Sequence, residues 1–166
     1  MANWLKYVIA FASAFALMLA IRTLAFSIHG VEGNGLTPLF HNGDRLLISR
    51  VSYGLRIAGN GLLPYSRLMR SQVKKGDIVA FTLPSDTITG LCIARCKAVP
   101  GDTIATAEGP MLVPGLVNCA KTDYYWLESI NPQNPADSRH IGFVPESHII
   151  GKVVSVLYNR NNIRLQ

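Results

Sequence analysis

The stretch that decides the fold is GNGLTPLFHNGDRLLISR, which runs from Gly33 to Arg50. It holds two turn clusters, GNG at 33–35 and NGD at 42–44, with Pro38 between them. The proline fixes its own φ and pushes the residue before it towards an extended backbone. After the second turn, the β-rich run LLI at 46–48 predicts a strand. We therefore expect the chain to bend at glycines, extend through a proline, turn again and enter a sheet.

The segment before this stretch, residues 4–26, is the most apolar part of the chain. It has no charge from Tyr7 to Ile21, and the flanking Lys6 and Arg22 can extend their charged ends to opposite membrane interfaces. The pattern predicts a membrane anchor at residues 1–26. A cleaved secretory signal is the alternative, but small-x-small sites such as AFA at 10–12 lie inside the apolar run, which favours a retained anchor.

Length, composition and charge narrow the class of protein. The 166 residues leave room for this helix and one domain of ordinary size. The net charge of +6 suggests either nucleic acid or an anionic membrane as a partner. No zinc spacing, phosphate-binding loop or stacking-aromatic signature is present, so we predict the membrane as partner, and no nucleic acid, metal or other cofactor.

Residues 45–75 combine seven basic residues with apolar side chains and contain no acidic residue. This composition beside an anchor predicts a membrane-proximal insertion whose surface rests on anionic lipid. A solvated basic loop over the sheet is the alternative. The basic residues are Arg45, Arg50, Arg56, Arg67, Arg70, Lys74 and Lys75.

Four later segments predict further strands. The run KGDIVAF at 75–81 is a turn followed by a strand, and residues 91–99 form another strand that ends at the turn PGD at 100–102. The aromatic run YYWL at 124–127 is expected in the core, and HIIGKVVSVLY at 148–158 closes the sheet. Cys92 and Cys96 are too far apart along one strand to form a disulfide with each other; free thiols, or a pairing of either with Cys119, remain.

Taken together, these segments resemble the type I signal peptidases. Pro38 falls on a proline of that family's first box, Leu36 falls on its methionine, and Gly35 falls where the family has its nucleophilic serine. In the second box, Arg95 and the turn at 100–102 align, whereas Ala94 stands where the family has its general-base lysine.

The third box lies at residues 131–145, NPQNPADSRHIGFVP. Gly142 and the pair VP at 144–145 align with the family, as does DSR at 137–139. Pro135 occupies the place of the serine that helps hold the lysine. The resemblance implies structural roles for four residues, two of which, Asp137 and Arg139, are expected to form an ion pair; the four are Arg95, Asp102, Asp137 and Arg139.

The resemblance also implies the architecture and the location. It predicts a mainly β protein in which one N-terminal transmembrane helix, residues 1–26, precedes a signal-peptidase-like β domain, residues 27–166. It further implies a bacterial cytoplasmic (inner) membrane protein with a single pass, a cytoplasmic N-terminus and an extracytoplasmic main domain. In this family the substrate-binding positions correspond to Leu36, Pro38 and Ala94.

The substituted positions remove the chemistry of a serine–lysine peptidase. Gly35 has no side chain to attack a carbonyl, and Ala94 cannot accept a proton. Thr37 is the nearest hydroxyl and is the remaining candidate nucleophile. Lys97 is a poor replacement for the base, because alternation along a strand places it on the face of Arg95, away from position 94.

Three functional hypotheses follow. The first is a catalytically degenerate member that binds extended segments of exported proteins or signal peptides, or assists a secretion or surface-assembly complex. The second is an active signal peptidase with a nonstandard set of catalytic residues. The third, a membrane-surface module that binds no peptide, is disfavoured because Leu36, Pro38 and Ala94 are positions that would shape a peptide groove.

Overall fold

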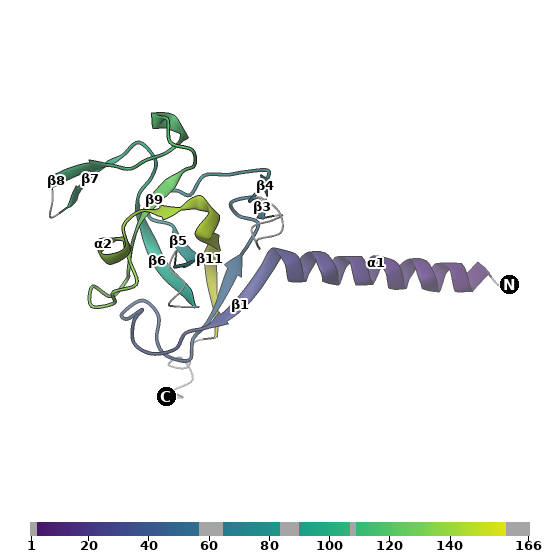
Figure 1. Cartoon of the computed structure of the whole chain (residues 1–166). Coiled ribbons are helices and arrows are strands. Elements are labelled where there is room, and N and C mark those ends of the chain that lie inside the picture. Colours follow the sequence, from purple (N-terminus) through teal and green to yellow (C-terminus); the bar gives the residue numbers. More distant parts are fainter. Residues whose placement is uncertain (1–2, 57–64, 84–89, 107–108, 159–166) are drawn as a thin grey trace, which may run out of the picture.

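A computed structural model describes residues 3–56, 65–83, 90–106 and 109–158 of the chain. One long helix, α1 at Asn3–Ala25, projects from a curled β domain, and the N-terminus lies at its far tip (Figure 1). The helix contains neither glycine nor proline, so nothing in its interior interrupts the backbone hydrogen bonds. The predicted helix is therefore present over residues 4–25.

The prediction that this helix spans a membrane is not supported. Within the described parts of the chain, no helix is both long enough and apolar enough to cross a bilayer.

The β domain is built around one seven-stranded sheet with the strand order β1-β2-β11-β5-β6-β9-β10. Every neighbouring pair in it is antiparallel, which confirms the mainly β prediction. Its strands are β1 (Phe26–Gly30), β2 (Arg45–Ser49), β5 (Ile78–Thr82), β6 (Leu91–Ala98), β9 (Tyr124–Glu128), β10 (Val144–Pro145) and β11 (Ile149–Tyr158).

Two small hairpins and three short helices complete the described structure. The hairpins are β3 (Leu55–Arg56) with β4 (Arg67–Leu68), and β7 (Thr103–Thr106) with β8 (Gly109–Leu112). The helices are η1 (Leu116–Asn118), α2 (Ser138–Ile141) and η2 (Glu146–His148). Strand β11 pairs with both β2 and β5, so the last strand lies in the middle of the sheet.

The two faces of β6 pack into two different core clusters. Ile93 packs with Val31, Phe40 and Leu46, so this cluster joins β6 to the glycine-rich stretch. The next residue, Ala94, faces the main core, which contains Tyr125 and other residues of β5, β9 and β11. The aromatic strand is buried as predicted. Tyr125 and Leu127 lie in the main core, and Trp126 lies in a third cluster.

The 45–75 insertion is only partly described, because residues 57–64 lie outside the described ranges. Its described basic residues do not form one free basic surface. Arg67 is buried against Glu146, with 3.9 Å between Nε and Oε1, and Arg70 pairs with both Glu146 and Asp123. Lys75 pairs with Asp102 at 2.8 Å. Three of the seven predicted lipid-facing charges are therefore paired with acids of the same domain, and one of them, Arg67, is buried.

Candidate functional site

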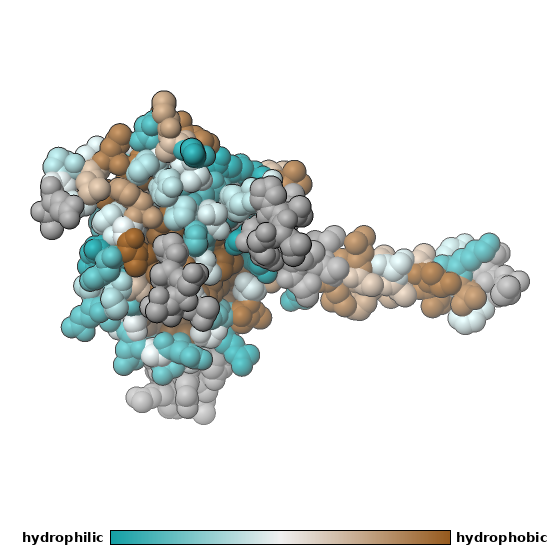
Figure 2. Space-filling model, viewed as in Figure 1, coloured by the Kyte–Doolittle hydropathy of each residue, from teal (hydrophilic) through white to brown (hydrophobic). Residues whose placement is uncertain are grey.

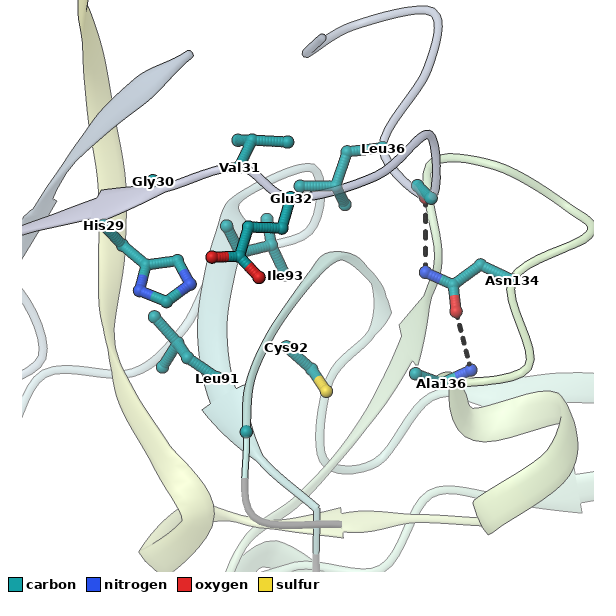
Figure 3. Close-up of a pocket in the computed structure, with 12 residues that line it drawn as sticks. His29, Gly30, Val31, Glu32, Leu36, Leu91, Cys92, Ile93, Asn134 and Ala136 are labelled. Atoms are coloured by element: carbon teal, nitrogen blue, oxygen red, sulfur yellow. Dashed lines mark hydrogen bonds between the residues drawn. The ribbon is translucent and has the colours of Figure 1, made fainter. Parts of the chain in front are cut away.

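Two strand edges without partners face each other across a pocket. Strand β1 pairs only with β2 among the described strands. In β6, residues 91–94 pair with β5 on one side only, because β9 joins the other side from Arg95 onwards. A cavity of about 330 Å³ lies between these two segments, and residues from both line it (Figure 3). Among the described residues, the backbone groups on both sides of this groove have no partner strand, and strand edges of this kind can pair with an added strand.

The groove has mostly apolar walls. They come from Val31 and Leu36 on the glycine-rich side and from Leu91 and Ile93 on β6. Cys92 adds a half-buried thiol between the last two, and burial raises its pKa. The remaining described lining residues are His29, Gly30, Glu32, Gly35, Gly90, Asn134 and Ala136.

Gly35, which the resemblance places at the family nucleophile, lines the groove and is covered by Asn134. The Asn134 amide donates to the Gly35 carbonyl oxygen at 3.2 Å and accepts from the Ala136 N–H at 3.1 Å (Figure 3). A Cβ built on Gly35 would lie 2.9 Å from the Asn134 amide nitrogen. The Asn134 amide, from the 131–136 loop, therefore occupies the space that a serine side chain at position 35 would fill.

Asn131 provides a second link between the same two loops, because its amide donates to the Asn34 carbonyl oxygen at 3.2 Å. Thr37, the candidate nucleophile, also bonds to this oxygen: its hydroxyl donates to it at 2.8 Å. Its hydroxyl is thus engaged within its own turn, and among the described residues no histidine hydrogen-bonds to it. Pro38 is exposed, follows a cis peptide bond and is absent from the described lining of the groove.

Ala94, the position of the family base, is fully buried in the main core and is absent from the described groove lining. Of the three positions that the resemblance assigns to substrate binding, only Leu36 is found at the groove. Arg95 and Lys97 are both exposed and line a separate small surface hollow with Glu128. The predicted shared face of Arg95 and Lys97 is therefore observed, and Lys97 does not point towards position 94.

The ion pair predicted between Asp137 and Arg139 is present. The buried Asp137 carboxylate also accepts from the backbone N–H of Ser129 at 3.1 Å and of Arg139 at 3.0 Å, so it caps α2. Burial alone would raise the pKa of this carboxyl, but the hydrogen bonds from Arg139, Ser129 and His140 lower it overall. Pro135, the position of the base-orienting serine, is exposed and contributes its carbonyl to the Asp137 N–H.

Asp102 stabilises the turn at residues 99–102 and is not part of the described groove lining. Its carboxylate accepts from the Val99 N–H at 2.7 Å and pairs with Lys75. All three cysteines are free: Cys119 is exposed, Cys92 is half-buried and Cys96 is buried. The alternative of a disulfide to Cys119 is therefore wrong.

Sequence reasoning missed two residues of this site, Glu32 and Asn134. The only signal in the sequence for Glu32 is that no other acidic residue precedes Asp44. Asn134 precedes the substituted Pro135, but its contact with Gly35 joins residues 99 positions apart, which no local pattern indicates.

The fold and groove define a class: a β domain behind a long N-terminal helix, with an open groove between β1 and β6. The family described as "Signal peptidase, peptidase S26" matches residues 3–117, more than half of the chain. The protein therefore belongs to this family.

Curated relatives agree with the family and include proteins of differing activity. The chain is 24% identical to a probable signal peptidase I-2 of Synechocystis, over 90% of this chain and 71% of that protein. It is 22% identical to an inactive signal peptidase IA of Staphylococcus aureus, over 89% and 88% of the two chains. A shorter match, 35% identity over 49% of this chain and 48% of the other, is to mitochondrial inner membrane protease subunit 1 of Mus musculus.

Proposed function

We propose that this protein is a signal-peptidase-like protein without peptidase activity, which holds an extended segment of an exported chain in its groove. The observation that carries the proposal is the combination of free strand edges at the groove with the absence of catalytic side chains at Gly35 and Ala94. Two unpaired strand edges flank the groove, while Gly35 offers no nucleophile and Ala94 offers no base. A relative named as an inactive signal peptidase, matched over most of both chains, supports the same reading.

Strand addition accounts for how such a groove binds a peptide. Backbone groups of the peptide pair with the free edge of β1 or of residues 91–94, and alternate side chains enter the pocket. The backbone bonds favour no particular sequence, so the groove suits many exported chains. Binding then positions a client for a partner of a secretion or surface-assembly system rather than cutting it.

We further propose that the domain works against a membrane surface, on the side where exported chains emerge. Hydrophobic residues extend along α1 (Figure 2), and an apolar hollow of about 510 Å³ lies at its junction with the β3–β4 hairpin. At that hollow Met69 is 87% exposed and adopts a positive φ of 53°, which is uncommon for a residue other than glycine. An exposed apolar patch of this kind marks an interaction surface.

The test combines peptide binding with cleavage, using the purified full-length protein in detergent. Iodoacetamide modification of Cys92, read by mass spectrometry, reports occupancy of the groove, and the exposed Cys119 is the internal control. Cys96 should stay unmodified, because burial, with a smaller contribution from nearby Asp77, raises its pKa to about 12. We expect an alanine-rich nonapeptide to slow modification of Cys92 but not of Cys119, and to remain uncut.

Two results would contradict the proposal. If the peptide leaves Cys92 modification unchanged at saturating concentration, the groove does not bind extended chains. If a preprotein with a small-x-small site is cleaved, and Thr37→Ala abolishes the cleavage, the protein is an active peptidase with a nonstandard nucleophile.

A further inference from the structure

The pocket carries one charged side chain whose role the proposed function does not explain. Glu32 is the only Asp, Glu, Lys or Arg among the described residues that line the groove. Among the described residues it forms no hydrogen bond or ion pair. Figure 3 shows its carboxylate extending from the chain after β1 towards β6, on the same side as the His29 ring.

Every other carboxylate of the described domain accepts at least one hydrogen bond, and five of them also form ion pairs. Asp77 accepts from Lys152 at 2.7 Å, Asp102 from Lys75 at 2.8 Å, and Glu146 and Asp137 pair with arginines. The chain has an excess of six positive charges, so partners for an acidic residue are plentiful. Glu32, which is exposed at the groove, is therefore the one described carboxylate that accepts no hydrogen bond and forms no ion pair.

We propose that this groove selects extended peptides that carry a lysine or arginine, and that Glu32 receives the cationic end. This inference rests on the proposed function and names its substrate class. A long basic side chain has an apolar stem for the walls formed by Leu36, Leu91 and Ile93, and a cation for the carboxylate. His29 adds a ring nitrogen that can accept a hydrogen bond when the ring is uncharged.

The size of the pocket supports a long side chain over a small one. Its volume of about 330 Å³ lies at the lower end of the range for pockets that enclose whole ligands. An alanine side chain would leave most of that volume unfilled and would leave the carboxylate without a partner. An acidic side chain would meet Glu32 as a like charge and is expected to bind worst.

The experiment compares three nonapeptides of alanine with a single variable residue at the fifth position: lysine, acetyl-lysine or glutamate. The alanine background lets each peptide shift its register until the variable side chain enters the pocket. Affinity is measured by fluorescence anisotropy with full-length protein in detergent, and groove occupancy by protection of Cys92. We expect the lysine peptide to bind roughly 3- to 10-fold more tightly than the acetyl-lysine peptide.

The matched variants are Glu32→Gln and Glu128→Gln, which remove the same charge at different places. Glu128 lies outside the groove, where it accepts from the Trp126 indole N–H, a bond that glutamine also accepts. We expect Glu32→Gln to abolish the preference for lysine and Glu128→Gln to leave it intact. If both variants weaken the preference equally, net charge rather than Glu32 explains it, and the inference is wrong.

The failures of the two proposals are distinguishable. If all three peptides protect Cys92 and bind equally, the groove is a peptide site without charge selection, and only the inference is overturned. If the lysine preference survives in Glu32→Gln, Glu32 is not the receptor for the cation. If no peptide protects Cys92, the proposed function itself fails.

Discussion

The groove and the charged network behind the main core use polar residues in opposite ways. The network brings together Arg67 and Arg70 of the insertion, Asp123 just before β9 and Glu146 of η2, and the two acids are almost fully buried. In the groove, loops are joined through neutral amides, and the one carboxylate has no described partner.

The difference shows on which polar residues the fold depends and which residues at the groove it leaves free to vary. Buried charges that depend on one another are costly to change singly, so the network constrains substitution. Gly35 and Ala94 have no side-chain partners to lose, and Gly35 is instead packed against Asn134. The proposed loss of catalysis at positions 35 and 94 is therefore compatible with an intact scaffold.

The largest expected effect is on the network. Replacing Glu146 by alanine should lower the free energy of unfolding by about 3–5 kcal/mol, because it leaves the buried Arg67 guanidinium without its carboxylate. Urea unfolding followed by tryptophan fluorescence measures the change. A loss below about 1 kcal/mol would show that the network does not hold the insertion to the sheet.

The next effect concerns the two positions that the resemblance assigns to catalysis, Gly35 at the groove and Ala94 in the main core. A lysine at position 94 would be fully buried, which favours the neutral amine that a general base needs. A serine at position 35 meets the Asn134 amide, a contact expected to cost about 1–3 kcal/mol. Adding Asn134→Ala to the Gly35→Ser/Ala94→Lys variant should therefore raise preprotein cleavage by roughly 10-fold or more.

Cleavage rates from gel densitometry compare the double and triple variants, with Gln133→Ala as the loop control. Gln133 lies in the same loop, and its described hydrogen bond is made by its backbone N–H rather than by its side chain. Equal rates for the double and triple variants would show that Asn134 does not obstruct position 35.

A smaller effect is expected in acid at Asp77, which belongs to the scaffold. Burial alone would raise the pKa of this carboxyl, but hydrogen bonds from Lys152, the Lys74 N–H and Tyr53 lower it below its ordinary value of 3.8. Its contribution to stability is therefore present above about pH 4 and is lost as the pH falls through the lower folded pKa. Urea midpoints for the wild type should fall over this window, and Asp77→Asn should reduce the slope.

The smallest effect is expected for the unpaired carboxylate. Glu32→Gln should change the free energy of unfolding by less than about 0.5 kcal/mol, because no described interaction is lost. The same urea titration measures it. A loss above 1 kcal/mol would mean that Glu32 supports the fold, and the contrast between groove and network would disappear.

Much of the plan of the domain was readable from local sequence. The turns at 33–35 and 42–44, the strand after them, the buried aromatic run and the closing strand all depend on residue types next to one another. The loss of a hydroxyl at Gly35 and of an amine at Ala94 is likewise a matter of residue identity. No packing interaction can supply a side chain that is absent.

Tertiary structure decided what depends on distant parts of the chain. The facing edges of β1 and β6, the Asn134 amide on Gly35 and the pairing of Arg70 with Glu146 join segments separated by tens of residues. Local patterns carry little information on such contacts, because they follow from how the sheet curls and packs. For the same reason local composition does not distinguish a lipid-facing surface from charges that pair within the domain, as Arg67 and Arg70 do with buried acids.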